Sequence, residues 1–207
     1  MKRLVIKVGT AVLTQDGQLA IERMENLVDL IAKLKNEKKL EVILVSSGAV
    51  GAGYTTLKLD KKIIANKQAL AAIGQPLLLK HYKKRFKEHN ISCAQMLFIA
   101  DDFDSRKRTK NAQDVMEILL ENKILPIINE NDVIANYELL FGDNDQLAAH
   151  VAFHFKADML AILSDIDGYY NKNPREFDDA VLQKEVSFID PSELQMTHTA
   201  NSEFATG

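Results

Sequence analysis

The chain has 207 residues, of which 46% are hydrophobic and 27% charged, with a formal net charge of -3. This length suits one domain with a substantial core, and the composition is that of a folded globular protein rather than a disordered one. A sequence pI of about 6.0 argues against a general nucleic-acid binder, which needs a basic face. The single cysteine, Cys93, excludes an intrachain disulfide and a cysteine-based metal cage, and its apolar neighbours indicate a small buried residue.

The N-terminus superficially looks like the start of a signal peptide, because Met1-Lys2-Arg3 precedes an apolar run. Lys7 and Gly9 interrupt that run too early for a signal peptide, so it predicts a strand instead. No apolar stretch approaches the ~18 residues that a membrane span requires. We therefore expect a cytoplasmic protein that does not bind membranes.

Strands and helices alternate along the sequence. Nearly uniform apolar strands between amphipathic helices predict an α/β fold, a three-layer αβα sandwich around a mostly parallel central sheet. The predicted elements are strands at 4–8, 42–45, 91–98, 124–128 and 159–163, helices at 21–34, 67–87, 111–122 and 145–155, and a short hairpin at 133–140.

No repeat, low-complexity tract or linker divides the chain, so we expect a single domain over residues 1–207. The polar segment 201–207 has no predicted strand or helix behind it. Because a doubly wound sheet normally continues past such a loop, we expect that the C-terminal portion of the domain is missing.

The first strand ends in Lys7-Val8-Gly9-Thr10. Burying the Lys7 ammonium without a partner would be costly, so it either has a functional partner or lies on an edge strand and reaches water. Gly9 lets the backbone approach an anion, and amides at such a turn can cradle phosphate. No Gly-Lys pair occurs in the chain, which excludes a Walker A motif.

The second strand leads into a loop of small residues, Ser46-Ser47-Gly48-Ala49-Val50-Gly51-Ala52-Gly53. Its glycines predict either backbone N–H donors wrapped around a small anionic group or a tight packing turn. The spacing does not fit Gly-x-Gly-x-x-Gly, so it is not a dinucleotide-binding fingerprint.

Two polar clusters follow the buried strand at 124–128. They are Asn129-Glu130-Asn131-Asp132 and Gly142-Asp143-Asn144-Asp145, the second at the start of a predicted helix. Open α/β sheets bind ligands beyond the carboxyl ends of their strands, so these groups are candidates for a binding site. Ser164-Asp165-Ile166-Asp167-Gly168 after the last strand could hold a metal or a ribose, or shape a turn.

Two other patterns are weaker candidates. His150 and His154 have the i, i+4 spacing of zinc ligands, but no third ligand accompanies them, which favours packing or surface roles. The basic run 106–110 follows Asp101, Asp102 and Asp104, so its field is mixed. It indicates a solvated loop or a subunit contact rather than a nucleic-acid site.

In this order, the motifs after the strands resemble the amino acid kinase family. The runs Lys67-Gln68-x-Leu70-Ala71-Ala72-x-Gly74-Gln75 and Ile128-Asn129-Glu130-Asn131-Asp132 narrow the resemblance to its glutamate 5-kinase branch. It covers essentially the whole chain and implies ATP-dependent phosphorylation of the γ-carboxylate of L-glutamate, the first step of proline biosynthesis. The family's second phosphate-clamp loop would open at Ala205-Thr206-Gly207, without its lysine, and no PUA domain follows.

The resemblance also implies roles for residues around ATP. Lys7 matches the lysine that contacts the transferred phosphoryl group, and Asp145 matches the aspartate that orients the catalytic lysines. The remaining matches to nucleotide- and phosphate-binding positions are Gly9, Thr10, Ser164 and Asp165.

Around the acceptor, Ser47, Asp132 and Asn144 match the positions that hold glutamate, with Asp132 facing its α-ammonium. Gly48 and Ala49 match the turn around the reacting carboxylate. The acceptor is already ionised, so no general base is required, and Mg²⁺ is expected to arrive with ATP rather than in a protein metal site.

The family also implies feedback inhibition by proline and a homo-oligomer. Rival interpretations are a family member acting on acetylglutamate, aspartate, carbamate or UMP, and a non-catalytic module that senses glutamate or proline. Asp132 discriminates within the family, because its carboxylate would repel UMP and gain nothing from an acetylated amine.

Overall fold

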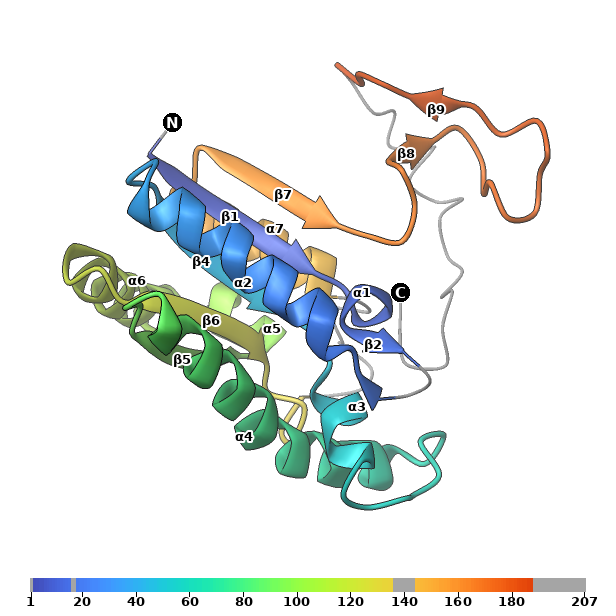
Figure 1. Cartoon of the computed structure of the whole chain (residues 1–207), viewed down its shortest axis with the longest axis horizontal. Coiled ribbons are helices and arrows are strands. Elements are labelled where there is room, and N and C mark those ends of the chain that lie inside the picture. The colour runs from blue at the N-terminus through green and yellow to red at the C-terminus, as the bar shows by residue number, and fades with distance from the viewer. Residues whose placement is uncertain (1, 16–17, 136–143, 188–207) are drawn as a thin grey trace.

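The computed structural model describes residues 2–15, 18–135 and 144–187. Its centre is a five-stranded sheet with the strand order β5-β6-β4-β1-β7 (Figure 1). Every pairing within this sheet is parallel. The strands are β1 (Arg3–Val8), β4 (Glu41–Ser46), β5 (Cys93–Phe98), β6 (Leu125–Glu130) and β7 (Met159–Leu163).

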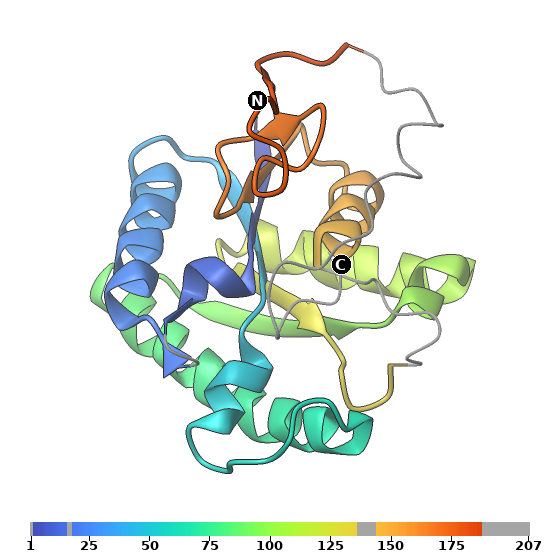
Figure 2. The same ribbon diagram turned by 90° about the vertical axis from the view of Figure 1, so that its right-hand side faces the viewer.

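Helices cover both faces of the sheet, as the two views in Figures 1 and 2 show. Alternate strand residues face opposite layers. Leu4 and Ile6 pack in the core with α2 (Ile21–Asn36) and α4 (Ile64–Glu88), whereas Val5 packs in the core with α6 (Arg106–Glu121) and α7 (Asn144–His154). This arrangement confirms the predicted three-layer α/β fold. The helices are α1 (Thr10–Leu13), α2 (Ile21–Asn36), α3 (Ala49–Tyr54), α4 (Ile64–Glu88), α5 (Ala100–Asp104), α6 (Arg106–Glu121) and α7 (Asn144–His154).

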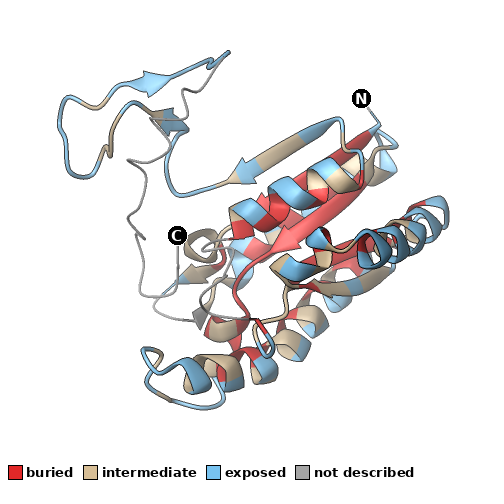
Figure 3. Cartoon of the chain, turned by 180° about the vertical axis from the view of Figure 1, so that it is seen from behind, coloured by how far each residue is buried: buried red, intermediate tan, exposed pale blue. Residues whose placement is uncertain are grey.

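Two small antiparallel hairpins lie outside the main sheet. One joins β2 (Thr14–Gln15) to β3 (Gln18–Leu19), and the other joins β8 (Tyr169–Tyr170) to β9 (Leu182–Gln183). Figure 3 shows the contrast between the buried strand β1 and the largely exposed β8–β9 segment.

The predicted strands and long helices are all present, with shifted ends. The basic run 106–110 is not a loop: it forms the first turns of α6, because the Ser105 hydroxyl accepts a hydrogen bond from the Arg108 N–H at 3.4 Å and caps the helix. Of the predicted hairpin at 133–140, residues 133–135 form a turn and the rest lies outside the described residues. The short helices α1, α3 and α5 were not predicted.

Cys93 is half-buried at the start of β5. Burial raises the pKa of its thiol to about 12. A thiol that remains protonated is a poor nucleophile, in agreement with the structural role expected for this cysteine. Among the described residues, no helix is long and apolar enough to cross a membrane.

Helices α3 and α4 cross in direct backbone contact. A Cβ atom added to Gly53 would overlap the Leu70 carbonyl, and one added to Gly74 would overlap the Ala49 carbonyl and lie 2.6 Å from the Gly53 nitrogen. Only glycine permits so close an approach. These two glycines therefore set the position of α3.

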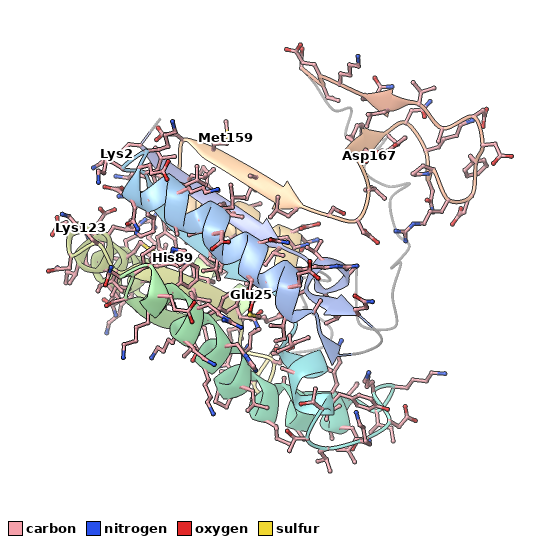
Figure 4. All side chains as sticks on the ribbon, in the orientation of Figure 1. Lys2, Glu25, His89, Lys123, Met159 and Asp167 are labelled. Atoms are coloured by element: carbon pink, nitrogen blue, oxygen red, sulfur yellow. The ribbon has the colours of Figure 1, made fainter. Side chains whose placement is uncertain are left out.

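A charged cluster lies at the edge of the sheet formed by the amino-terminal ends of its strands, where Figure 4 labels Lys2 and Met159. The buried Arg3 guanidinium donates to both oxygens of Glu117, at 2.7 and 2.9 Å, and to Glu41 at 2.9 Å. It also donates to the Phe155 carbonyl at 2.6 Å. The bidentate pair joins β1 to α6 and holds the pKa of Glu117 below its usual value.

We expect Glu117→Gln to lower the free energy of unfolding by about 1 kcal/mol at pH 7, since the half-exposed pair is partly screened by solvent. A depressed folded-state pKa contributes stability above the unfolded value of roughly 4.3, and that contribution is lost as the pH falls through the folded pKa. Urea unfolding at pH 7 and pH 3 tests this, with the exposed Glu121→Gln on the same helix as control. If the free energy of unfolding of Glu117→Gln differed from that of the wild type by the same amount at pH 3 as at pH 7, the prediction would be contradicted.

Candidate active site

The predicted polar groups meet at one edge of the molecule. Because the sheet is parallel, the carboxyl ends of its strands lie together, and Gly9, Ser47, Asp132 and Ser164 each follow a strand at that edge. The N-terminus of α7, which begins at Asn144, meets the same edge through its contacts with β4 and β6. Ligand sites of open α/β sheets lie in this position.

Lys7 is buried, with 3% of its surface exposed, and β1 lies between β4 and β7. The edge-strand interpretation of this lysine is therefore wrong. Its Nζ lies 2.5 Å from Oδ1 of Asp145, in the first turn of α7. A Cβ added to Gly9 would lie 3.4 Å from Nζ, so this glycine leaves room beside the ammonium. A buried cation compensated by a carboxylate is thus placed near the end of β1, an interior strand of the sheet.

Asn144 joins three chain segments. Its Nδ2 lies within hydrogen-bond distance of the Ser46 carbonyl (3.1 Å), the Ser47 hydroxyl (2.9 Å) and Oδ1 of Asn129 (2.8 Å). Oδ1 of Asn129 also accepts from the Glu130 N–H at 2.9 Å. The three residues that Asn144 contacts are buried, as is Asn144 itself, and these contacts fix the ends of β4 and β6 against the start of α7.

The segment after β4 differs from the predicted anion-wrapping loop. Gly48 adopts φ +100°, a left-handed conformation that favours glycine, and the chain enters α3 directly at Ala49. Gly51 and Gly53 lie inside this helix. The alternative interpretation of these glycines, tight packing, is correct for Gly53, because it contacts α4. Gly48 and Ala49, at the start of α3, lie next to the end of β4.

Asp132 is half-buried in the turn after β6, and α4 packs along that turn. Nε2 of Gln68 donates to the Val133 carbonyl and Nε2 of Gln75 donates to the Glu130 carbonyl, both at 3.3 Å. Burial raises the pKa of Asp132 to about 6, and the positive charge of Lys67 opposes that rise. The carboxyl group is therefore mostly ionised at pH 7 and suited to a cationic ligand.

On the other flank, Ser164 and Asp165 follow β7 in an exposed segment that leads to Asp167, labelled in Figure 4. Oδ2 of Asp165 lies 2.5 Å from Nη2 of Arg175, which lowers the pKa of Asp165. The Gly9 N–H donates to the Leu163 carbonyl at 3.3 Å, so the ends of β1 and β7 are adjacent. Thr10, the first residue of α1, is half-buried beside Gly9.

His150 and His154 stack on Phe103, with ring centroids 5.1 and 5.2 Å away. Across residues 2–15, 18–135 and 144–187, no group of three or more His, Cys, Asp or Glu side chains could hold a metal ion. The stacking on Phe103 agrees with the packing or surface roles expected for these histidines.

Asn129 and Ser46 were named from the sequence only as members of longer candidate runs, and nothing in those runs distinguishes them as the residues that contact Asn144. Tyr82 was not singled out from the sequence. Its hydroxyl oxygen lies 2.9 Å from that of Ser46, but it belongs to an apolar helix face, where one polar group carries no visible pattern.

Comparison with known proteins agrees with this geometry. Residues 2–207 match the sequence profile of the amino acid kinase family. The chain belongs to this family. It is 56% identical to the glutamate 5-kinase of Wolinella succinogenes, over 100% of the chain and 80% of that protein. It is 52% identical to the glutamate 5-kinase of Leishmania donovani, over 100% of the chain and 78% of that protein.

Two solved structures of other kinases share the fold. The UMP kinase of Ureaplasma parvum superposes with a TM-score of 0.61 at 17% identity, covering 94% of this chain and 84% of that one. The isopentenyl phosphate kinase of T. acidophilum gives 0.60 at 15% identity, covering 87% and 78%. At these identities the likeness establishes the fold alone.

Proposed function

We propose that this chain transfers the γ-phosphoryl group of ATP to the γ-carboxylate of L-glutamate, forming L-glutamyl 5-phosphate and ADP in the first step of proline biosynthesis. Membership of a kinase family and the relatives named glutamate 5-kinase support this reaction. The observation that carries it is the presence, at one sheet edge, of the buried Lys7–Asp145 pair and the ionisable Asp132. The Lys7–Asp145 pair would contact the transferred phosphoryl group, and the Asp132 carboxylate would bind the amino group of the acceptor.

In this proposal the acceptor binds between β4, β6 and α7. The Asp132 carboxylate pairs with the α-ammonium of glutamate, and Ser47 and Asn144 hold the remainder of the amino acid. Gly48 and Ala49 lie beside the reacting γ-carboxylate. The hydrogen bonds of Asn144 to both Ser46 and Ser47 support this assignment, because they hold the pocket walls in place before the substrate arrives.

Phosphoryl transfer then needs positioning and charge compensation rather than a base. A γ-carboxylate oxygen attacks the γ-phosphorus, and the bond to the bridging oxygen breaks to release ADP. Lys7 offsets the charge on the phosphoryl oxygens, while Asp145 keeps the ammonium in position. Gly9 and Thr10 lie beside the phosphates, with Ser164 and Asp165 toward the nucleoside.

Mg²⁺ belongs to the same proposal. Mg²⁺ usually keeps several waters and is bound mainly through substrate phosphate oxygens, so the ion is proposed to arrive with ATP. Bound to ATP, the ion would neutralise part of the phosphate charge. Omitting Mg²⁺ should abolish transfer without preventing glutamate binding.

Trapping the acyl phosphate with hydroxylamine tests the function. Glutamate, acetylglutamate and aspartate serve as separate acceptors with MgATP. Hydroxamate formation with glutamate alone is the expected result. Efficient transfer to acetylglutamate or aspartate instead would assign the chain another acceptor. Glutamate binding without transfer would favour a sensing module.

We expect kcat/KM for glutamate to fall roughly tenfold per pH unit below pH 6, because protonation of Asp132 removes the charge that binds the ammonium. Lys67→Met should move this midpoint to higher pH, since the lysine charge lowers the pKa of Asp132. The exposed Lys62→Met serves as control. A midpoint that stays in place in Lys67→Met would contradict the assignment of Asp132.

The same pocket makes proline a candidate feedback inhibitor, because proline also carries an ammonium beside a carboxylate. Inhibition by added proline that weakens as the glutamate concentration is raised would support this proposal, and rates unchanged by proline would reject it.

We also propose that the protein is a homo-oligomer and is located in the cytoplasm. Light scattering tests the oligomeric state.

A further inference from the structure

Tyr82 places a hydroxyl group in the apolar core beneath the candidate acceptor pocket. It lies on α4 with 0% of its surface exposed, and its ring stacks on Phe86 at a centroid distance of 6.1 Å. Its hydroxyl oxygen is 2.9 Å from the hydroxyl oxygen of Ser46, the last residue of β4. Ser46 is also fully buried. The pair therefore joins the C-terminal third of α4 to the end of β4, where the proposed acceptor pocket begins.

The hydrogen bonds run in one direction. The Ser46 hydroxyl donates its proton to the Ser47 carbonyl at 3.0 Å, so the Tyr82 hydroxyl must be the donor to Ser46. Burial raises the pKa of Tyr82 well above its usual value, which keeps it a donor at every working pH. The Ser46 carbonyl is held separately by Asn144 at 3.1 Å. Ser46 and the peptide that follows it are thus fixed from two sides.

Stability alone does not account for this pair. Exchanging both partners of a buried hydrogen bond for apolar groups of similar shape is often nearly neutral, and the Tyr82 ring would pack equally well without its oxygen. What the hydroxyl adds is a fixed orientation for the Ser47 carbonyl, and so for the Ser47–Gly48 peptide that begins the left-handed turn at Gly48.

We propose that Tyr82 is a positioning residue for the phosphoryl-transfer reaction, acting through Ser46 to orient the Ser47–Gly48 segment around the acceptor carboxylate. The inference rests on the proposed function, since it assigns Tyr82 to the acceptor side of that reaction. Tyr82 itself does not touch the substrate. Its influence is confined to glutamate and leaves the nucleotide side, formed after β1 and β7, unaffected.

Tyr82→Phe tests the proposal, because it removes only the oxygen. We expect about a 5- to 10-fold loss of kcat/KM for glutamate, the size of one lost hydrogen bond, with KM for ATP unchanged. The double variant Tyr82→Phe with Ser46→Ala should lose no more kcat/KM for glutamate than Ser46→Ala alone, since each substitution removes the same Tyr82–Ser46 hydrogen bond. Tyr54→Phe on the neighbouring helix is the matched control. Activity within twofold of the wild type, or equal losses for both substrates with a lower melting temperature, would overturn it.

The amide resonances of Ser47 and Gly48 give a readout independent of turnover. They should shift and broaden in Tyr82→Phe and stay unchanged in Tyr54→Phe. If the wild-type protein transferred no phosphate to glutamate, the proposed function would fail. The resonances would still decide whether Tyr82 orients the Ser47–Gly48 segment. Unchanged resonances in Tyr82→Phe would reject that role regardless of activity.

Discussion

Lys7→Met is expected to reduce kcat for transfer to glutamate by a factor of about 10²–10³, the usual loss when one preorganised donor to a developing charge is removed. The residue is buried on β1, an interior strand, and its Nζ lies 2.5 Å from Oδ1 of Asp145. No other position of β1 can supply a cation at the strand end, because the flanking residues are apolar.

Lys7→Met also affects stability, and this effect must be separated from the effect on activity. Removing one partner of a buried ion pair leaves the other charge uncompensated and is destabilising; here the loss is reduced because the Asp145 side chain is 44% exposed, although its Oδ1 atom is buried. Steady-state rates and melting temperatures of Lys7→Met and of the exposed Lys33→Met separate the two effects. A kcat within tenfold of the wild type would remove Lys7 from the phosphoryl site.

Gly74→Ala should destabilise the protein by roughly 3 kcal/mol or prevent folding, because its Cβ would overlap the Ala49 carbonyl and neither backbone can move freely. Helix α3 would have to shift away from α4. Since Gly48 and Ala49 begin that helix, the remaining folded protein should also lose affinity for glutamate.

Gly51→Ala is the matched control for this prediction. It lies in α3, and its Cβ would lie 3.2 Å from the Thr14 methyl group, which can move by a few tenths of an ångström. Alanine also favours a helix interior over glycine by roughly 1 kcal/mol, so this variant should be neutral or stabilised. Equal melting temperatures for Gly74→Ala and the wild type would show that the α3–α4 contact is looser than described.

The layered fold was predictable because its inner strands β1, β4 and β6 are buried on both faces and are nearly continuous apolar runs in the sequence. The same regularity identified Lys7, the charged residue inside such a run. The start of α6 was missed because residues 106–110 are basic and lack apolar periodicity. Helix α3 was missed because glycines normally indicate a loop, and contact with a helix far along the chain cannot be read locally.

The edge carrying the site was also predictable, since parallel strands bring their carboxyl ends together. The hydrogen-bond partners within the site were not predictable from the sequence. Asn144 bonds to groups 15, 97 and 98 residues away, and Tyr82 to one 36 residues away. Such pairs depend on how helices are placed across the sheet, which strand and helix patterns do not specify.

Comparing glutamate with glutarate as acceptors in the wild type and in Asp132→Asn tests the central claim most directly, because glutarate lacks only the α-ammonium. We predict that the wild type prefers glutamate by at least about tenfold in kcat/KM, the value of one charge-assisted contact, and that Asp132→Asn abolishes the preference. A wild type that uses both acceptors equally, or an Asp132→Asn variant that keeps the full preference, would contradict glutamate recognition at this edge.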